Sequence, residues 1–192
     1  GTNGSGVFRY SGKKFSYYTD KNGLPNKYVN AVTEDEKGNI WVAITDNGVM
    51  KLNGSIKENF KADYKTGKGI CDNNVKAMIR TSDGRIYFGT EDGLSYFENG
   101  NFVTLTDERI RHKYIMTLYA ESAQKIWIGT TDGVLLLENG ELKEAESINK
   151  WRAPGFELPV YSICGDGKGN VYFGTETGFI QQSNTGSVSF SA

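Results

Sequence analysis

A segment with one fixed internal spacing recurs four times in this chain and constrains its fold more than any other feature. Each copy starts with Val or Ile, has another hydrophobic residue three positions later, and carries an aromatic residue twelve positions after its start. The starts are Val29, Val75, Ile115 and Val160, and the aromatic residues are Trp41, Tyr87, Trp127 and Tyr172. Successive starts lie 46, 40 and 45 residues apart. Repeats of about 40 to 50 residues built from short strands are typical of β-propeller blades.

The third copy gives the clearest strand pattern. Short apolar segments over residues 115–120, 126–130, 134–137 and 141–143 alternate with turn sequences, and we name these strands a to d in chain order. Asp132-Gly133 and Asn139-Gly140 mark turns, because Gly adopts positive φ and Asn-Gly favours a tight hairpin. The charged stretch 138–150 contains Asn139-Gly140, which disfavours a helix there, and we expect no helix elsewhere. The pattern predicts an all-β chain of four-stranded antiparallel meanders.

The repeat divides the chain into about four and a half blades. We expect a half-blade at 1–24, complete blades at 25–69, 70–110 and 111–155, and a last blade at 156–192. Such meanders bury little alone and must stack face to face, so the four repeated aromatic residues are expected to pack between blades. The chain opens with Gly1-Thr2, which matches the middle of a repeat, and this favours part of a larger propeller. A closed four-bladed ring is the alternative.

Composition excludes several classes of protein. The 192 residues include 22 basic and 23 acidic side chains, and a nucleic-acid-binding face needs a basic excess. No apolar run approaches the roughly 20 residues that span a bilayer. Cys71 and Cys164 fall in repeats that are not neighbours, so we expect two free thiols, with Cys164 buried in an apolar strand. With His112 as the one histidine, we expect no metal site and no cofactor.

Several motifs together resemble one family of repeats. The segment from Gly23-Leu24-Pro25-Asn26 to Asp46-Asn47-Gly48-Val49 resembles the two-component regulator propeller repeat, as do residues 86–94 and 126–134. Two departures are Leu158-Pro159, which lacks the glycine, and Ala43-Ile44, which replaces Gly-Thr. The resemblance implies a periplasmic or extracellular sensor domain of a Bacteroides-type hybrid histidine kinase. It also implies further propeller blades, a downstream immunoglobulin-like domain, and responses to oligosaccharides in many members.

Ligand residues are expected on one face of the propeller, where the d–a connections and the b–c turns lie. The a–b part of the repeat has a constant length, whereas the c–d and d–a segments vary in length. Variable loops on a rigid scaffold are the usual place for binding residues. Aromatic rings can stack on a sugar, while cations pair with a carboxylate or sulfate. The candidate ligand-binding residues are Lys27, Tyr28, Asn74, Arg111, His112, Tyr114, Trp151, Arg152 and Tyr161. The same connections also hold Asn26, Asp72, Asn73 and Lys113. Trp151-Arg152 is the strongest candidate pair for ligand binding. Alternatively, Trp151 covers a blade edge.

The sequence favours a sensor over an enzyme. Asp35, Asp83, Asp132 and Asp166 lie in turns, where Asp caps its own backbone, and no catalytic set can be assembled around His112. We therefore expect a non-catalytic, ligand-sensing propeller. The alternatives are a scaffold for protein–protein interaction and, third, a propeller lyase or hydrolase. The expected ligand is an oligosaccharide or another small molecule. Other expected partners are further blades, the immunoglobulin-like domain, and copies of the chain itself that bind through exposed blade faces. We expect no binding to nucleic acid and no membrane insertion.

Overall fold

The computed structural model describes residues 1–54, 56–153 and 155–191, and its strands form five antiparallel sheets within those ranges. The first sheet pairs β1 (Val7–Tyr10) with β2 (Phe15–Tyr18), and a 3-10 helix, η1 (Asp20–Asn22), follows it. The next two sheets comprise β3 (Val29–Glu34), β4 (Ile40–Ile44), β5 (Val49–Asn53) and β6 (Ile56–Phe60), then β7 (Val75–Arg80), β8 (Ile86–Thr90), β9 (Gly93–Glu98) and β10 (Asn101–Thr104). The last two comprise β11 (Ile115–Ser122), β12 (Lys125–Thr130), β13 (Val134–Glu138) and β14 (Glu141–Glu144), then β15 (Val160–Gly165), β16 (Val171–Thr175), β17 (Gly178–Ser183) and β18 (Gly186–Ser191).

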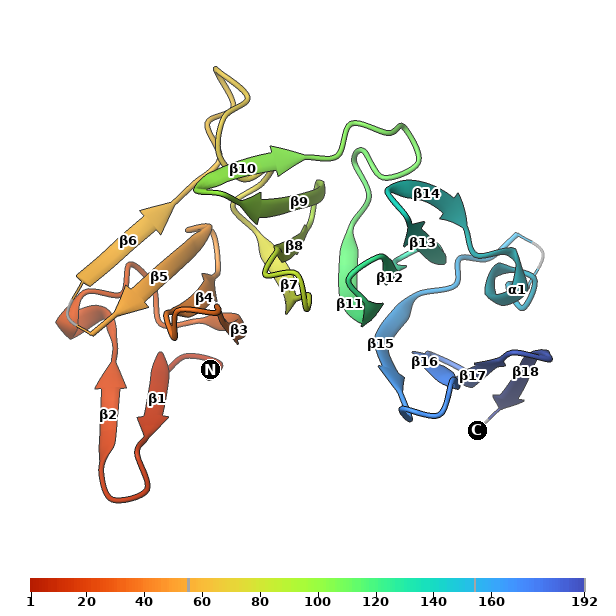
Figure 1. Cartoon of the computed structure of the whole chain (residues 1–192), viewed down its shortest axis with the longest axis horizontal. Coiled ribbons are helices and arrows are strands. Elements are labelled where there is room, and N and C mark those ends of the chain that lie inside the picture. Colours follow the sequence, from red (N-terminus) through yellow and green to blue (C-terminus); the bar gives the residue numbers. More distant parts are fainter. Residues whose placement is uncertain (55, 154, 192) are drawn as a thin grey trace.

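The five sheets stand side by side in an open arc (Figure 1). Each four-stranded sheet pairs its strands in chain order, so it is a meander. Strands β3, β7, β11 and β15 line the concave side, and the first and last sheets lie at separate ends of the arc (Figure 1). The predicted all-β fold of stacked propeller blades is therefore confirmed. Among the described residues, β1–β2 does not pair with β15–β18, so the closed four-bladed ring is wrong.

The repeat is also visible in the strand register. Strand a of every complete sheet carries an irregularity after its first residue, at Val29, Val75, Ile115 and Val160. Each of these residues is also the start of a sequence repeat. The spacing in the sequence thus corresponds to one backbone geometry, repeated four times.

A glycine in strand b lets the next blade approach closely. A Cβ built on Gly89 would lie 2.5 Å from Cγ2 of Ile115, at the start of the following strand a. Gly1 has the same environment, because a Cβ there would lie 2.6 Å from Cγ1 of Val29. Gly1-Thr2 therefore occupies the place of the repeated Gly-Thr pair, as its sequence predicts.

The repeated aromatic residues pack between neighbouring sheets. Trp41 is fully buried, and its ring lies 4.9 Å from Phe97 and 5.7 Å from Phe88, both in the second four-stranded sheet. Tyr87 and Trp127 are buried at the next two junctions. Tyr172 is only half-buried, because among the described residues no further sheet packs on its side of β15–β18. The predicted packing role is thus confirmed at three junctions, and the fourth residue lies on an uncovered face.

A carboxylate in the a–b turn holds the first of these aromatic residues. Asp35 accepts hydrogen bonds from the Asn39 amide at 2.7 Å and from the Trp41 indole at 3.1 Å. Burial alone would raise the pKa of Asp35, but these hydrogen bonds lower it below its ordinary value of 3.8. Asp35 therefore caps its turn, as predicted, and also orients a buried ring.

We predict a loss of stability in acid that depends in part on Asp35. Because its pKa is lower in the folded state, the unfolded chain binds more protons, and this contribution is lost as the pH falls below about 4. Asp35→Asn should be less stable than the parent at neutral pH and should lose less stability between pH 6 and pH 3, measured as the thermal midpoint. Equal pH dependence in both proteins would contradict this role.

Two local predictions were wrong. A short helix, α1 (Glu146–Asn149), follows β14, although no helix was expected. It forms because the buried Asn149 side chain bonds the backbone of Val134, so a tertiary contact outweighs weak helix propensity. Cys164 was expected to be buried but is exposed, whereas Cys71 is half-buried. Cys164 of β15 lies opposite Tyr172 of the neighbouring strand β16, on the uncovered side of the last sheet. Both thiols are free, as predicted.

Candidate functional site

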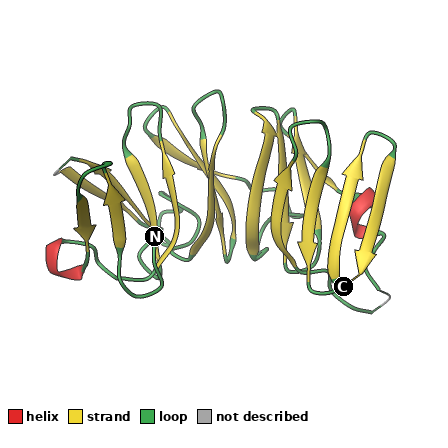
Figure 2. Ribbon diagram, turned by 90° about the horizontal axis from the view of Figure 1, so that it is seen from below, coloured by secondary structure: helices red, strands yellow, loops and turns green. Residues whose placement is uncertain are grey.

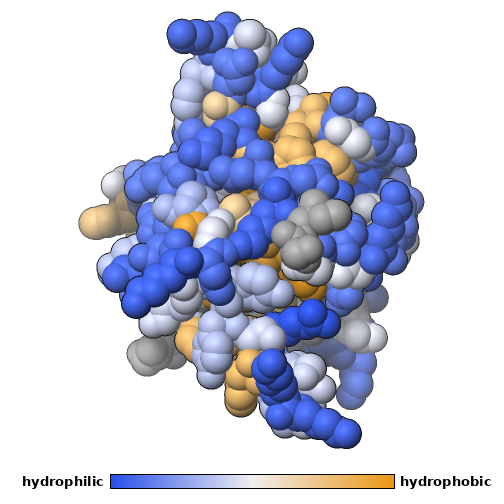
Figure 3. Space-filling model, turned by 90° about the vertical axis from the view of Figure 1, so that its left-hand side faces the viewer, coloured by the Kyte–Doolittle hydropathy of each residue, from blue (hydrophilic) through white to orange (hydrophobic). Residues whose placement is uncertain are grey.

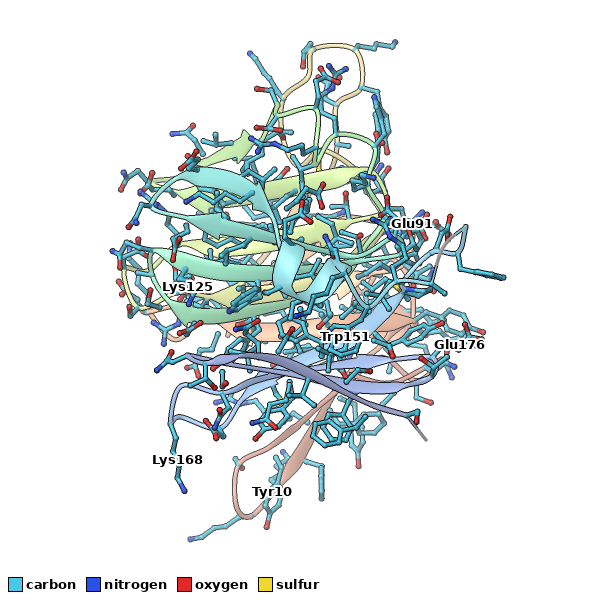
Figure 4. The ribbon with its side chains drawn as sticks, turned by 90° about the vertical axis from the view of Figure 1, so that its right-hand side faces the viewer. Tyr10, Glu91, Lys125, Trp151, Lys168 and Glu176 are labelled. Atoms are coloured by element: carbon cyan, nitrogen blue, oxygen red, sulfur yellow. The ribbon has the colours of Figure 1, made fainter. Side chains whose placement is uncertain are left out.

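The d–a connections and the b–c turns lie on one face of the sheets, which we call the b–c face. Three equivalent backbone hydrogen bonds link the residue before strand a to a b–c turn: Thr45 to Tyr28, Glu91 to Asn74, and Thr131 to Tyr114. Seen from the concave side, the strands run between two loop-bearing faces (Figure 2). Glu91 and Glu176 of the b–c turns lie at one of them, and Lys125 and Lys168 near the a–b turns lie at the other (Figure 4). The predicted arrangement of loops is therefore confirmed.

A cleft of about 250 Å³ opens on the b–c face beside the third four-stranded sheet. Three segments build it: the end of the connection into β11, the β12–β13 turn, and the connection that contains α1. Its lining residues are Lys113, Thr130, Asp132, Gly133, Val134, Leu135, Glu144, Glu146, Asn149 and Arg152. Two cations, three carboxylates and an amide thus meet around one small hollow.

Asp132 stands at the centre of the hydrogen bonds in this cleft. Its carboxylate pairs with the Lys113 ammonium and accepts from the Thr130 hydroxyl at 2.8 Å, while its carbonyl accepts from Nη1 of Arg152 at 3.1 Å. Burial raises the pKa of Asp132, but the bonds from Lys113 and Thr130 lower it below the ordinary value. Asp132 therefore stays ionised at neutral pH and fixes both cations at the rim.

Asn149 fastens the α1 connection to the sheet. Its Oδ1 accepts from the Val134 amide at 2.8 Å, and its Nδ2 donates to the Val134 carbonyl at 3.0 Å and to Glu144 at 2.9 Å. The side chain is buried, so these bonds replace those to water. Because this anchor is rigid, the polar groups of Glu144, Glu146 and Arg152 are held at the cleft.

A second polar cluster lies on the same face at the neighbouring junction. The Lys76 ammonium, on the inner strand β7, lies 2.8 Å from Glu91 and 5.7 Å from the ring centre of Tyr114. Burial lowers the pKa of Lys76, but Glu91 and Tyr114 raise it above its ordinary value. Tyr114 directly follows Lys113 of the cleft, so the two clusters are contiguous along the chain. Together the two clusters contain the aromatic ring of Tyr114 and several charged groups that can form hydrogen bonds.

Comparison with known proteins identifies the repeats. The two-component regulator propeller model matches residues 23–46 and 69–92. These segments are two-component regulator propeller repeats. The match covers strands a and b of the first two complete blades. No curated protein sequence matches the chain.

Solved structures share the propeller fold of these repeats. The extracellular domain of BT4673 from B. thetaiotaomicron, assigned to a hybrid two-component system, aligns with a TM-score of 0.73 at 21% identity, over 98% of this chain and 25% of that one. The extracellular domain of BT3049 from B. thetaiotaomicron, also assigned to a hybrid two-component system, aligns with a TM-score of 0.76 at 18% identity, over 95% of this chain and 26% of that one. Virginiamycin B lyase from Staphylococcus aureus aligns with a TM-score of 0.67 at 13% identity, over 95% of this chain and 61% of that one. The chain spans about a quarter of the first two structures.

The blades bring some predicted site residues to the clusters and leave others apart. Arg152 lines the cleft, and Tyr114 contacts Lys76. Tyr28 and Asn74 occupy the position equivalent to Tyr114 in other repeats, and their backbones bond the b–c turns. Tyr161 is exposed on the concave strand β15, and Lys27 is exposed before β3. These residues therefore share the b–c face or the inner wall without forming one pocket.

Three other predicted residues have recorded side-chain partners within the chain. Arg111 pairs with Glu108 at 2.8 Å, and His112 lies 2.6 Å from Asp92. The Trp151 indole donates to the Ser187 hydroxyl at 3.1 Å on β18 (Figure 4 labels Trp151), so it covers a blade edge as in the alternative interpretation. The cleft residues Glu144, Glu146 and Asn149 were not predicted. The charges of Glu144 and Glu146 were visible in the sequence, but the stretch 138–150 was expected to form no helix and was given no site.

In the described ranges, no three His, Cys, Asp or Glu side chains are grouped so that they could hold a metal ion. No helix of the described chain is long and apolar enough to cross a membrane.

Proposed function

We propose that this chain is a non-catalytic, ligand-sensing part of an extracytoplasmic two-component regulator, and that an oligosaccharide binds in the cleft of the b–c face. The cleft carries the proposal, because it gathers Arg152, Lys113 and three carboxylates in one small hollow. The ring of Tyr114, in the second cluster, follows Lys113 directly in the chain. Sugar hydroxyls can donate to carboxylates and accept from cations, and a ring can stack on the apolar face of a sugar. A carboxylate or sulfate on the sugar would pair with Arg152.

The repeat family and the shared fold support this role and place. Regulator propeller repeats form two matched segments of the chain, and the extracellular domains of BT4673 and BT3049 have the same blade arrangement. In a longer polypeptide, further blades and a downstream immunoglobulin-like domain would adjoin this segment and pass occupancy of the cleft towards a kinase. The proposed location is therefore periplasmic or extracellular.

Calorimetric titration with neutral, uronic-acid and sulfated oligosaccharides tests the proposal. We expect one of these classes to bind, and Arg152→Ala to weaken that binding about 10-fold or more, since a hydrogen bond to a charged group contributes about 1.5 to 3 kcal/mol. Lys168→Ala is the matched control, because Lys168 is exposed on the opposite face. Binding that is equally weakened by both variants, or no binding to any class, would contradict the proposal.

A further inference from the structure

Trp151 and Arg152 are adjacent in the chain, but their side chains contact different blades. The Trp151 indole donates to the Ser187 hydroxyl of β18, in the last sheet, at 3.1 Å. Nη1 of Arg152 donates to the carbonyl of Asp132, in the β12–β13 turn of the preceding sheet, at 3.1 Å. The backbone amides of both residues donate to carbonyls of α1, at 3.0 and 3.1 Å. Because one helical turn carries both residues, a shift of Trp151 also moves the backbone from which Arg152 extends.

The Ser187 hydroxyl fastens this helical turn at two points. It accepts from the Trp151 indole and donates to the Ser147 carbonyl within α1. A hydroxyl carries one donor and can also accept, so both roles are filled at once. Ser187 is half-buried, and α1 contacts both β17 and β18. Strand β18 thus holds α1 near its start and just beyond its end.

The α1 connection is therefore held from the two sheets that it joins. Asn149 bonds the backbone of Val134 in the preceding sheet, and Ser187 bonds the connection from the last sheet. Glu146 and Arg152, which line the cleft, belong to the segment between these attachments. Ser187 itself is not one of the residues that line the cleft. A residue outside the cleft thus fixes the backbone that presents two charged groups to it.

The same contact recurs at the first complete blade. The 3-10 helix η1 lies in the connection that precedes this blade, and the Lys57 ammonium of β6 donates to the Asn22 carbonyl in η1. Lys57 is the second residue of β6, and Ser187 is the second residue of β18, the corresponding outer strand. Figure 3 views the end of the arc that carries β6 and η1, where most side chains are hydrophilic. Fastening a helical turn from the second residue of strand d is thus a property of the blade that occurs twice.

We infer that Ser187 is a positioning residue for the cleft, and that it acts through Trp151 on Arg152. The inference rests on the proposed function, because it concerns ligand affinity at the same cleft. Ordering a backbone segment costs conformational entropy, and a segment that is ordered before binding does not impose this cost on the ligand. Ser187 orders the turn that carries Arg152 in advance. Trp151, selected from the sequence as a ligand residue, thus contributes through the Ser187 bond and not by contact with the ligand.

Acrylamide quenching of tryptophan fluorescence tests the Ser187 bond without a ligand. The chain has three tryptophans, and Trp151 is 41% exposed whereas Trp41 and Trp127 are 0% and 5% exposed, so the quenchable fluorescence reports on Trp151. We expect Ser187→Ala to increase quenching, and Ser187→Thr, which keeps a hydroxyl, to resemble the parent. Ser189→Ala is the control, because Ser189 is exposed two residues further along β18. Unchanged quenching in Ser187→Ala would overturn the inference.

Calorimetric titration with the oligosaccharide that binds the parent most tightly tests the effect on affinity. We expect Ser187→Ala to weaken binding about 3- to 10-fold, and Ser187→Thr and Ser189→Ala to bind like the parent. In the Arg152→Ala background, Ser187→Ala should have no further effect, because Ser187 acts through Arg152. Circular dichroism checks that each variant is folded, and Trp151→Phe, which lacks the indole donor, replaces Ser187→Ala if that variant is not.

The outcomes separate this inference from the proposed function. Parent-like affinity of Ser187→Ala, or an equal loss in the Arg152→Ala background, would overturn the inference and leave the proposed function standing. Absence of binding to the parent would overturn the proposed function and the role of Ser187 in it, whatever the quenching experiment shows.

Discussion

Leu94→Asp is expected to prevent folding of the chain, whereas Phe179→Asp, at the same position of the repeat, should leave it folded. Leu94 is fully enclosed among Tyr87, Ile110 and Ile115 at the junction between the second and third complete sheets. An unpaired carboxylate there would cost several kcal/mol, a large part of the 5 to 15 kcal/mol that stabilise a typical domain. Phe179 is 41% exposed on the uncovered side of β15–β18, where an ionised side chain keeps its water.

Far-ultraviolet circular dichroism and tryptophan fluorescence of the two purified variants measure this difference. Phe179→Asp should keep the parent spectrum and a cooperative thermal transition. Leu94→Asp should be insoluble or should lack the transition. A Leu94→Asp protein with the parent midpoint would show that this junction is not the packed blade contact described above.

The second large effect is expected at the repeated aromatic position. Trp41→Ala should lower the free energy of unfolding by about 3 to 5 kcal/mol, because it empties a buried site and leaves the Asp35 carboxylate without its indole donor. Tyr172→Ala should lower it by only about 1 kcal/mol, because Tyr172 is half-buried at the uncovered end. Denaturation in urea measures both values.

Trp41→Phe separates the two contributions in this experiment. Phe keeps much of the contact with Phe60 and Phe97 but cannot donate to Asp35, so an intermediate loss of stability is expected. Equal losses for Trp41→Ala and Tyr172→Ala would contradict the distinction between covered and uncovered blades.

The fold could be predicted from the sequence because its determinants are local and repeated. The apolar residues of strands a and b, the turn glycines and Asn139-Gly140 all lie within one repeat. The glycine of the b–c turn has positive φ in all four blades, at Gly48, Gly93, Gly133 and Gly178. The helix α1 could not be predicted in this way. It has four residues and depends on the Asn149 contact with Val134, which only the folded sheet brings into reach.

The candidate site was predictable in position but not in detail. The b–c face follows from the blade meander, and Arg152 and Tyr114 were selected because they lie in its connections. The grouping of Lys113 with Asp132 and Arg152 joins three separate segments, and no local pattern contains it. Trp151 was selected because a loop tryptophan suits a sugar; its indole bonds Ser187 of β18, a contact between distant segments that no local pattern contains, while the residue stays 41% exposed.

We propose that ligand occupies the b–c face. Hydrogen exchange measured with and without the tightest-binding oligosaccharide tests this most directly, because it reports which backbone amides a ligand protects. We predict slower exchange in residues 130–134 and 144–152, around the cleft, and unchanged exchange in the a–b turns at 122–125 and 166–170. Protection confined to those a–b turns would place the ligand on the opposite face and contradict the account.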